Sequence, residues 1–168
     1  MRFTKLLPIS IGIIVFICLG GFSILNPESI SWISSGDPTQ HYLGWEFYRK
    51  SAWTIPIGLN PDFGLQISSS VVYSDSIPLL AVLFKAIRNI IPIPFQYFGI
   101  WYFVCVVGQA LVSWNIVGIY TDKDWIKAIG SLVFAFSPAM IGLFGITAAL
   151  SSHFLILIAL YLIIKKDS

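Results

Sequence analysis

The hydrophobic positions of this chain gather into four long runs, separated by polar segments of very different length. The first run, from Leu6 to Leu25, carries no charge and has the roughly 20 apolar residues that a membrane-spanning helix needs. The later runs cover residues 95–120, 128–147 and 150–164, of which the last is shorter. We therefore expect an all-α membrane protein with about four transmembrane helices, the first at about residues 6–25. Ser137-Pro138 lies inside the third run and should kink that helix.

The composition of the chain favours the same class. Of its 168 residues, 57% are hydrophobic and 11% are charged, more apolar surface than one soluble core of this size can hide. The net charge of +2 is too small to indicate nucleic acid, so we expect no nucleic-acid partner. Cys18 and Cys105 both fall inside expected spans, which favours packing over a disulfide.

The cations near the ends of the runs predict how the chain crosses the membrane, because cytoplasmic loops are rich in lysine and arginine. They form three pairs: Arg2 with Lys5, Lys123 with Lys127, and Lys165 with Lys166. All three pairs share one side if the chain crosses four times and residues 26–94 stay on the other. We expect a single domain over residues 1–168 in the bacterial inner (cytoplasmic) membrane, with an uncleaved, cytoplasmic N-terminus and an extracytoplasmic loop at 26–94.

Two segments of this outer loop, at about 38–53 and 77–91, are expected to be amphipathic helices at the membrane interface. The second is apolar enough to enter a bilayer, but Lys85 and Arg88 lie in its middle. A cation at the bilayer centre costs about 2.5–3.5 kcal/mol. We therefore expect the segment to lie in the interface, with both cations reaching toward the lipid headgroups. Asp75 and Ser76 precede its start at Pro78 and are expected to cap it.

The first of these segments begins with a polar block, Gly36 to Trp53, and has its own start signal. Asp37 followed by Pro38 predicts an N-cap and a proline at the first helical position, with Gln40 as the capping-box partner. Glu46, Arg49 and Lys50 then fall within about a third of the helix circumference. The remaining positions are rich in tryptophan and tyrosine, which suits the membrane interface.

Two residues of this block are candidate catalytic groups. Asp37 is either a carboxylate that acts as a general base or metal ligand, or the N-cap of the helix, and the two roles are compatible. His41 projects toward the apolar side, where it is either a catalyst or a hydrogen-bonded packing residue.

The remaining charged candidates also have two interpretations each. Arg49 and Lys50 could bind phosphate or could attract anionic lipid headgroups. Glu46 is expected to form a salt bridge with either of them. Asp75 is a capping residue or a second carboxylate for a divalent metal such as Mg²⁺ or Mn²⁺.

Three blocks of the sequence carry a resemblance to a known family. GDPTQHYLGWEFYRKSAWTIPIG, SSSVVYSDSIPLLAVLFK and PIPFQYFGIW resemble the start of an uncharacterised family of bacterial multipass membrane proteins, over roughly residues 5–165. That family is in turn similar to GT-C glycosyltransferases, with one span, a long outer loop and further spans.

The resemblance implies inverting sugar transfer from a polyprenyl-phosphate-linked donor at the extracytoplasmic face. It implies Asp37 as base or metal ligand, His41 as a second catalytic residue, and Gln40, Arg49 and Lys50 as substrate-binding residues beside membrane lipid. GT-C enzymes often carry an acidic pair in this loop, whereas here Gly36 precedes Asp37.

Four spans are few for the substrate cavity of such an enzyme. We therefore expect the chain to be the N-terminal part of a longer protein and inactive alone. The alternative is a non-catalytic integral membrane module, such as a transporter subunit or an assembly partner.

Overall fold

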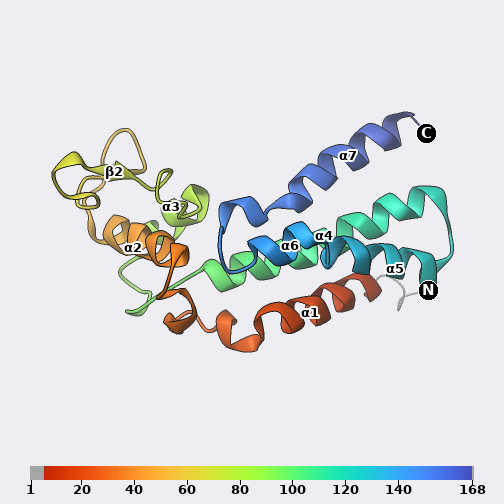
Figure 1. The fold of residues 1–168 in the computed structure, drawn as a ribbon. Coiled ribbons are helices and arrows are strands. Elements are labelled where there is room, and N and C mark those ends of the chain that lie inside the picture. The colour runs from red at the N-terminus through yellow and green to blue at the C-terminus, as the bar shows by residue number, and fades with distance from the viewer. Residues whose placement is uncertain (1–5, 168) are drawn as a thin grey trace. The chain divides into compact units, whose positions relative to one another are not determined.

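The computed structural model describes residues 6–167, without the side chain of Asp167, and helices make up most of it (Figure 1). Arg2 and Lys5 of the expected topology lie outside the described residues. The chain divides into two compact units. The helical unit contains Met1–Ser23, Ile100–Phe144 and Leu150–Ser168, and the loop unit contains Ile24–Gly99 and Gly145–Ala149.

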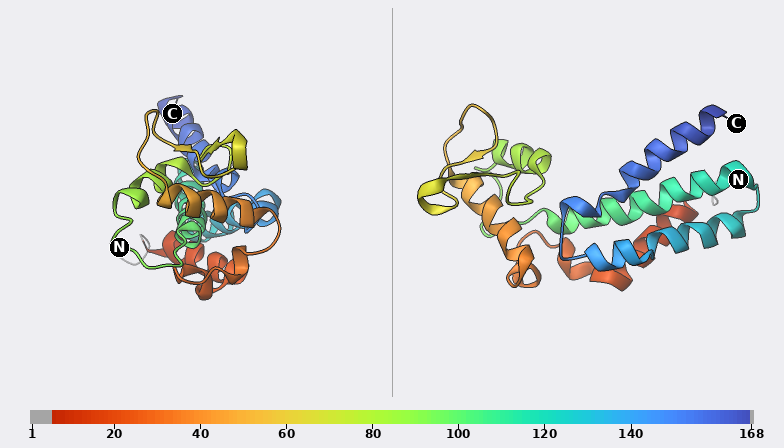
Figure 2. Two further views of the ribbon diagram at one scale, coloured as in Figure 1. Left: turned by 90° about the vertical axis from the view of Figure 1, so that its left-hand side faces the viewer. Right: turned by 45° about the horizontal axis from the view of Figure 1, so that its top comes forward.

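The helical unit is built from apolar helices that run side by side in both Figure 1 and Figure 2. They are α1 (Leu7–Gly20), α4 (Phe98–Tyr120), α5 (Asp124–Ala135), α6 (Pro138–Leu143) and α7 (His153–Asp167). Three stretches are long and apolar enough to cross a membrane: Phe98–Tyr120, Asp124–Leu143 and Ala149–Lys166. These helices indicate a membrane-embedded, mainly α-helical protein.

The first expected span is shorter than its hydrophobic run. Helix α1 ends at Gly20, where Gly21 turns the chain with a φ of 70°, and the 3₁₀ helix η2 (Phe22–Leu25) follows. Its 14 residues are about 21 Å long, less than the roughly 30 Å of a hydrocarbon core. The expectation of one helix over residues 6–25 is therefore wrong, and the fourth crossing stays a prediction.

The expected kink at Pro138 is confirmed. Helix α5 ends at Ala135 and α6 begins at Pro138, with the Ser137 hydroxyl accepting a hydrogen bond from the Met140 amide. The end of this apolar stretch was misplaced, because it stops at Leu143 rather than at residue 147. The residues that follow, Gly145–Ala149, fold with the loop unit.

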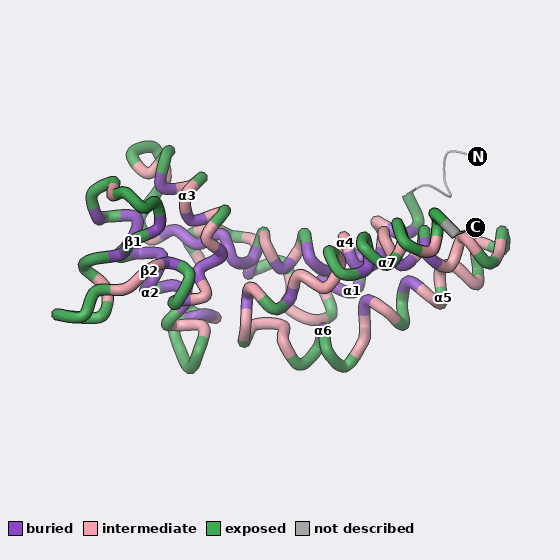
Figure 3. Tube along the Cα trace, turned by 90° about the horizontal axis from the view of Figure 1, so that it is seen from above, coloured by how far each residue is buried: buried purple, intermediate pink, exposed green. Residues whose placement is uncertain are grey.

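Close packing of α1 against α4 and α5 forms the centre of the helical unit. A Cβ atom on Gly12 would lie 2.7 Å from the Val107 Cα, so only glycine allows this approach. The ring of Phe16 packs edge-on against Phe103 and Phe144, with centroids 5.2 and 6.1 Å away. Figure 3 shows buried segments along these helices, with exposed segments on α5 and α7.

The loop unit is a small folded body rather than an open loop. It contains helices α2 (Asp37–Lys50) and α3 (Pro78–Ala86) and the 3₁₀ helices η3 (Ser31–Ile33) and η4 (Leu65–Ile67). Strand β1 (Leu59–Asn60) pairs antiparallel with β2 (Ser69–Ser70), in the register Leu59 to Ser70. Helix α2 packs on both α3 and β1.

An aromatic core holds the loop unit together. The Phe84 ring stacks on Tyr97, and the Trp45 ring packs edge-on against Tyr97, with centroids 5.2 and 5.1 Å apart. The Trp45 indole also donates a hydrogen bond to the Phe95 carbonyl. Trp45 and Tyr48 are fully buried, so these two aromatic residues of α2 face this core instead of a membrane interface.

The two cations of the second expected interfacial helix have hydrogen-bond partners within the loop unit. Lys85 is 1% exposed, and its Nζ donates to Ser51 Oγ and to the Ala52 carbonyl, each at 3.0 Å. Arg88 donates to the Arg49 and Ser51 carbonyls at 3.0 and 2.6 Å. Both therefore bind the carboxyl end of α2, where free carbonyls and the helix dipole attract cations.

Candidate functional site

The candidate site begins at the amino end of α2, where the expected cap is wrong. The N-cap residue is Gly36, with a φ of 67°, and Asp37 lies in the first turn of the helix. The Asp37 side chain is exposed and forms no hydrogen bond or ion pair with any residue between 6 and 167. Gln40 does not complete a capping box, since its Nε2 donates to the Tyr73 carbonyl at 3.3 Å. Among the described residues, Asp37 therefore has no hydrogen-bond or ion-pair partner that explains its carboxylate.

His41, one turn further along, is buried between two carbonyl groups. Its Nδ1 lies 3.0 Å from the Ser74 oxygen, and its Nε2 lies 2.9 Å from the Ile146 oxygen. The Asp75 Oδ2 lies 3.7 Å from Nε2. This geometry fits the hydrogen-bonded packing role of His41.

The first two of the three sequence blocks, residues 36–58 and 68–85, contact each other at this point. Ser76 Oγ donates to the His41 carbonyl at 2.8 Å, and it lies 2.8 Å from Ser74 Oγ. The Tyr97 hydroxyl donates to the Ser76 carbonyl. Asn60 Nδ2 donates to the Gly44 carbonyl at 2.8 Å.

Sequence reasoning missed the roles of Asn60, Ser74 and Ser76. One signal was present in the sequence. A glycine inside a helix costs about 1 kcal/mol relative to alanine. Gly44 is such a residue, and it allows the close approach of Ser74 and Ser76.

Asp75 and Ser76 do not cap the helix that follows them. The N-cap of α3 is Ile77, with a φ of 50° and no side-chain hydrogen bond. Instead Asp75 faces His41, which gives this carboxylate a partner. Among residues 6–167, no three or more His, Cys, Asp or Glu side chains form a group that could hold a metal ion. A metal-binding role of Asp37 and Asp75 therefore stays a prediction.

The carboxyl end of α2 carries the predicted ion pairs of Glu46. Its carboxylate lies 3.2 Å from Lys50 Nζ and 3.6 Å from Arg49 Nη1, which confirms the expected salt bridge with both cations. Arg49 is only 3% exposed, and its Nη2 donates to the Ile91 and Pro92 carbonyls at 3.1 and 2.7 Å. Lys50 is exposed.

A small hollow opens at this end of the loop unit. Its volume is about 200 Å³, and it is lined by Arg49, Lys50, Arg88, Asn89 and Ile93. The sequence did not suggest Arg88 as part of a site, because its partners are carbonyls 37 and 39 residues away in the chain. Burial and the neighbouring Arg88 lower the pKa of Lys85 to about 8. The hollow is therefore rich in positive charge.

Comparison with known proteins finds a family match over nearly all of the chain. Residues 9–168 match the family described as a domain of unknown function (DUF6311). The chain belongs to the DUF6311 family. No curated protein and no solved structure matches it. The resemblance to GT-C glycosyltransferases therefore rests on sequence features alone.

The predicted site residues of this DUF6311 chain divide between the two ends of α2. Asp37, Gln40 and His41 lie at its amino end, and Arg49 and Lys50 lie at its carboxyl end. The rise of an α-helix places residues 37 and 50 about 20 Å apart. A single sugar–phosphate bond cannot contact both groups. The carboxylate and the cationic hollow are therefore separate features of the DUF6311 surface.

Proposed function

We propose that this DUF6311 chain takes part in sugar transfer from a polyprenyl-phosphate donor at the extracytoplasmic face of the bacterial inner membrane. It would act as part of a GT-C-like glycosyltransferase, with the loop unit outside and Lys123, Lys127, Lys165 and Lys166 on the cytoplasmic side. The observation that carries the proposal is Asp37, an exposed carboxylate without a structural partner among residues 6–167. The resemblance of the sequence to GT-C glycosyltransferases supplies the reaction class, which is sugar transfer.

The chemistry assigned to Asp37 is that of a general base. An acceptor hydroxyl attacks the anomeric carbon of the sugar while the Asp37 carboxylate takes the hydroxyl proton. The bond from the anomeric carbon to the phosphate oxygen breaks, and polyprenyl phosphate leaves with the electron pair. The amino end of α2 favours a negative charge on Asp37.

Arg49 and Lys50 take a different part in this proposal than the family resemblance implied. They lie about 20 Å from Asp37 along α2, too far to hold the phosphate whose bond breaks. Arg49, Lys50 and Arg88 are the cations that line the hollow, and each also has a partner within the loop unit. We assign this hollow to the anionic headgroup of a neighbouring membrane lipid. Other cations hold the donor phosphate.

A non-catalytic role, as an assembly partner or transporter subunit, is the second candidate. The observation that favours it is that His41, Gly44, Ser74 and Ser76 bond or pack against one another. The packing of the loop unit would then explain most of the residues in the sequence blocks 36–58 and 68–85. Leu65 and Ile67 are 92% and 91% exposed, and a partner protein would cover such side chains.

The transfer reaction itself separates the two candidates. The full-length protein is reconstituted in liposomes with a panel of polyprenyl-phosphate-linked hexoses, each radiolabelled, and a bacterial membrane extract supplies acceptors. Loss of label from one carrier, faster than in protein-free liposomes, supports the enzyme. Equal loss with and without protein, for every donor in the panel, favours the non-catalytic module.

A further inference from the structure

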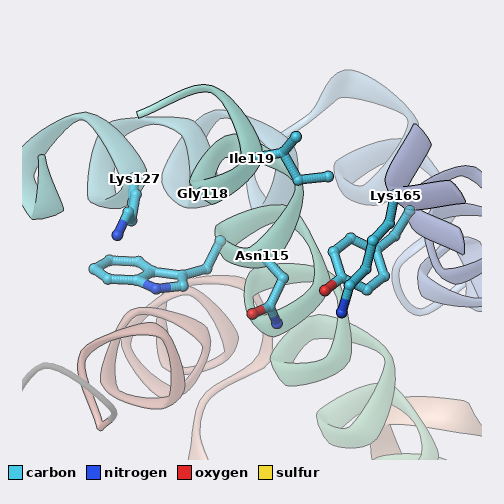
Figure 4. A pocket seen from close by; sticks show the side chains of 7 residues that line it. Asn115, Gly118, Ile119, Lys127 and Lys165 are labelled. Atoms are coloured by element: carbon cyan, nitrogen blue, oxygen red, sulfur yellow. The ribbon is translucent and has the colours of Figure 1, made fainter. Parts of the chain in front are cut away.

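A second pocket lies within the helical unit and shares no residue with the candidate site of the loop unit. Its volume is about 420 Å³, and its lining comes from α4, α5 and α7 (Figure 4). The lining residues are Trp114, Asn115, Gly118, Ile119, Lys127, Tyr161 and Lys165. All of them belong to the helical unit.

Two lysines from different helices give this pocket its charge. Lys127 of α5 has its Nζ 3.4 Å from Asp124 Oδ1 and 5.8 Å from the ring of Trp114. Lys165 of α7 has its Nζ 5.5 Å from the Tyr161 ring and is exposed. In Figure 4, Asn115 lies between the two lysines. The lining residues include two lysines and no acid, which suits an anion.

The amide of Asn115 adds a polar group to the middle of the pocket. Its Nδ2 donates to the Leu111 carbonyl at 2.8 Å, and its Oδ1 has no hydrogen-bond partner within the described part of the chain. This oxygen can accept a hydrogen bond from a ligand hydroxyl. Gly118 keeps the helix surface beside it open, because a Cβ there would meet only the stem of Lys127.

The pocket lies where three candidate spans end. Its residues come from the carboxyl half of α4, the start of α5 and the end of α7, close to the turn between Tyr120 and Asp124. Lipid headgroups occupy this depth of a membrane, and tryptophan and tyrosine are frequent there. Only 11% of the apolar window of α7 is buried, so acyl chains have exposed helix surface to contact.

We propose that this pocket binds the headgroup of an anionic phospholipid that carries hydroxyl groups, such as phosphatidylglycerol. Lys127 and Lys165 bind the phosphate, and Asn115 Oδ1 accepts a hydrogen bond from a headgroup hydroxyl. Basic pockets between membrane helices are suited to anionic lipids, since each lysine near the surface contributes about 1 kcal/mol. The inference is independent of sugar transfer, because it uses none of the residues of the loop unit.

The test measures lipid binding by the full-length protein in detergent, by native mass spectrometry with added phosphatidylglycerol or phosphatidylcholine. The wild type should bind phosphatidylglycerol more tightly than phosphatidylcholine. Lys165→Gln should weaken phosphatidylglycerol binding about fivefold, because one lysine contact contributes about 1 kcal/mol to the binding free energy. The matched control is Lys166→Gln, which removes the same charge from the next residue, outside the pocket. It should change binding less than about twofold.

Three outcomes would overturn the proposal. They are equal binding of the two lipids, equal losses in the Lys165 and Lys166 variants, and displacement of the lipid by inorganic phosphate at millimolar concentration. The last result would assign the pocket to a free anion. Gly118→Leu provides a second variant, because it fills the pocket and leaves both lysines in place. It should also weaken phosphatidylglycerol binding, and unchanged binding would contradict the proposed location.

Discussion

Gly44 of α2 and Ser74 of the loop before α3 lie so close together that a Cβ atom on Gly44 would be 2.2 Å from Ser74 Oγ. The same Cβ would lie 2.7 Å from Ser76 Oγ. These residues belong to two sequence blocks about 30 positions apart, and their contact joins the blocks into one folded unit. Of the two hydroxyls beside Gly44, that of Ser76 also donates to the His41 carbonyl.

Replacing Gly44 by alanine should therefore destabilise the loop unit. Overpacking of a close contact costs about 1–3 kcal/mol, more than the roughly 1 kcal/mol that alanine gains over glycine in a helix. Thermal unfolding of the purified protein in detergent, followed by tryptophan fluorescence, measures the change. Gly142→Ala is the control, because a Cβ on this helical glycine meets nothing within 4 Å. A Gly44→Ala protein as stable as wild type would show that the blocks do not pack this closely.

His41→Phe should loosen the two segments that the imidazole joins. The change removes the hydrogen bonds of the ring with the Ser74 and Ile146 carbonyls, and each lost hydrogen bond costs about 0.5–1.5 kcal/mol. Hydrogen–deuterium exchange should therefore rise in residues 145–149 and in the segment around Ser74. His153→Phe is the control, since His153 begins α7 and takes no part in this network. Unchanged exchange in both segments would mean that His41 does not hold them.

The lowered pKa of Lys85 predicts how stability changes with pH. Burial and Arg88 bring the folded-state value down from 10.5 to about 8. Between these two values the unfolded chain binds more protons than the folded one, so the Lys85 contribution to stability rises with pH. The unfolding temperature of wild type, relative to Lys85→Met, should therefore increase from pH 8 to pH 10. A constant or falling difference would contradict a charge buried against Ser51 and Ala52.

The expected topology can be tested with single cysteines in a background that lacks Cys18 and Cys105. Gln66 is exposed in the loop unit, and Asp122 is exposed in the turn between α4 and α5. A membrane-impermeant maleimide added to intact cells should label Gln66→Cys and should not label Asp122→Cys until the cells are opened. The reverse labelling pattern would place the loop unit in the cytoplasm. It would contradict the proposed use of a sugar donor at the extracytoplasmic face.

Local sequence rules predicted the features that depend on neighbouring residues. The kink at Pro138 and the ion pairs of Glu46 with Arg49 and Lys50 follow from spacings of a few positions. The same rules placed the cap on Asp37, because a glycine at the preceding position has no side chain to signal a cap. Gly36 nonetheless takes this position with a positive φ, which glycine adopts readily.

The errors concern residues whose partners are distant in sequence. Lys85 and Arg88 looked like cations without partners, and the carbonyls at the end of α2 that bind them are 33 to 39 residues away. The partner of His41 at Ile146 is 105 residues away. Helical periodicity carries no information at this range, so the compact loop unit could not be predicted from the sequence.

The central claim, that Asp37 is the base for sugar transfer, is tested most directly by the initial rate of transfer from a polyprenyl-phosphate-linked sugar. With the full-length protein in liposomes, Asp37→Asn should lower this rate at least about 100-fold, the usual contribution of a general base. Asp62→Asn, which changes another exposed acid of the loop unit, should leave the rate unchanged. A rate for Asp37→Asn equal to that of wild type would contradict the account.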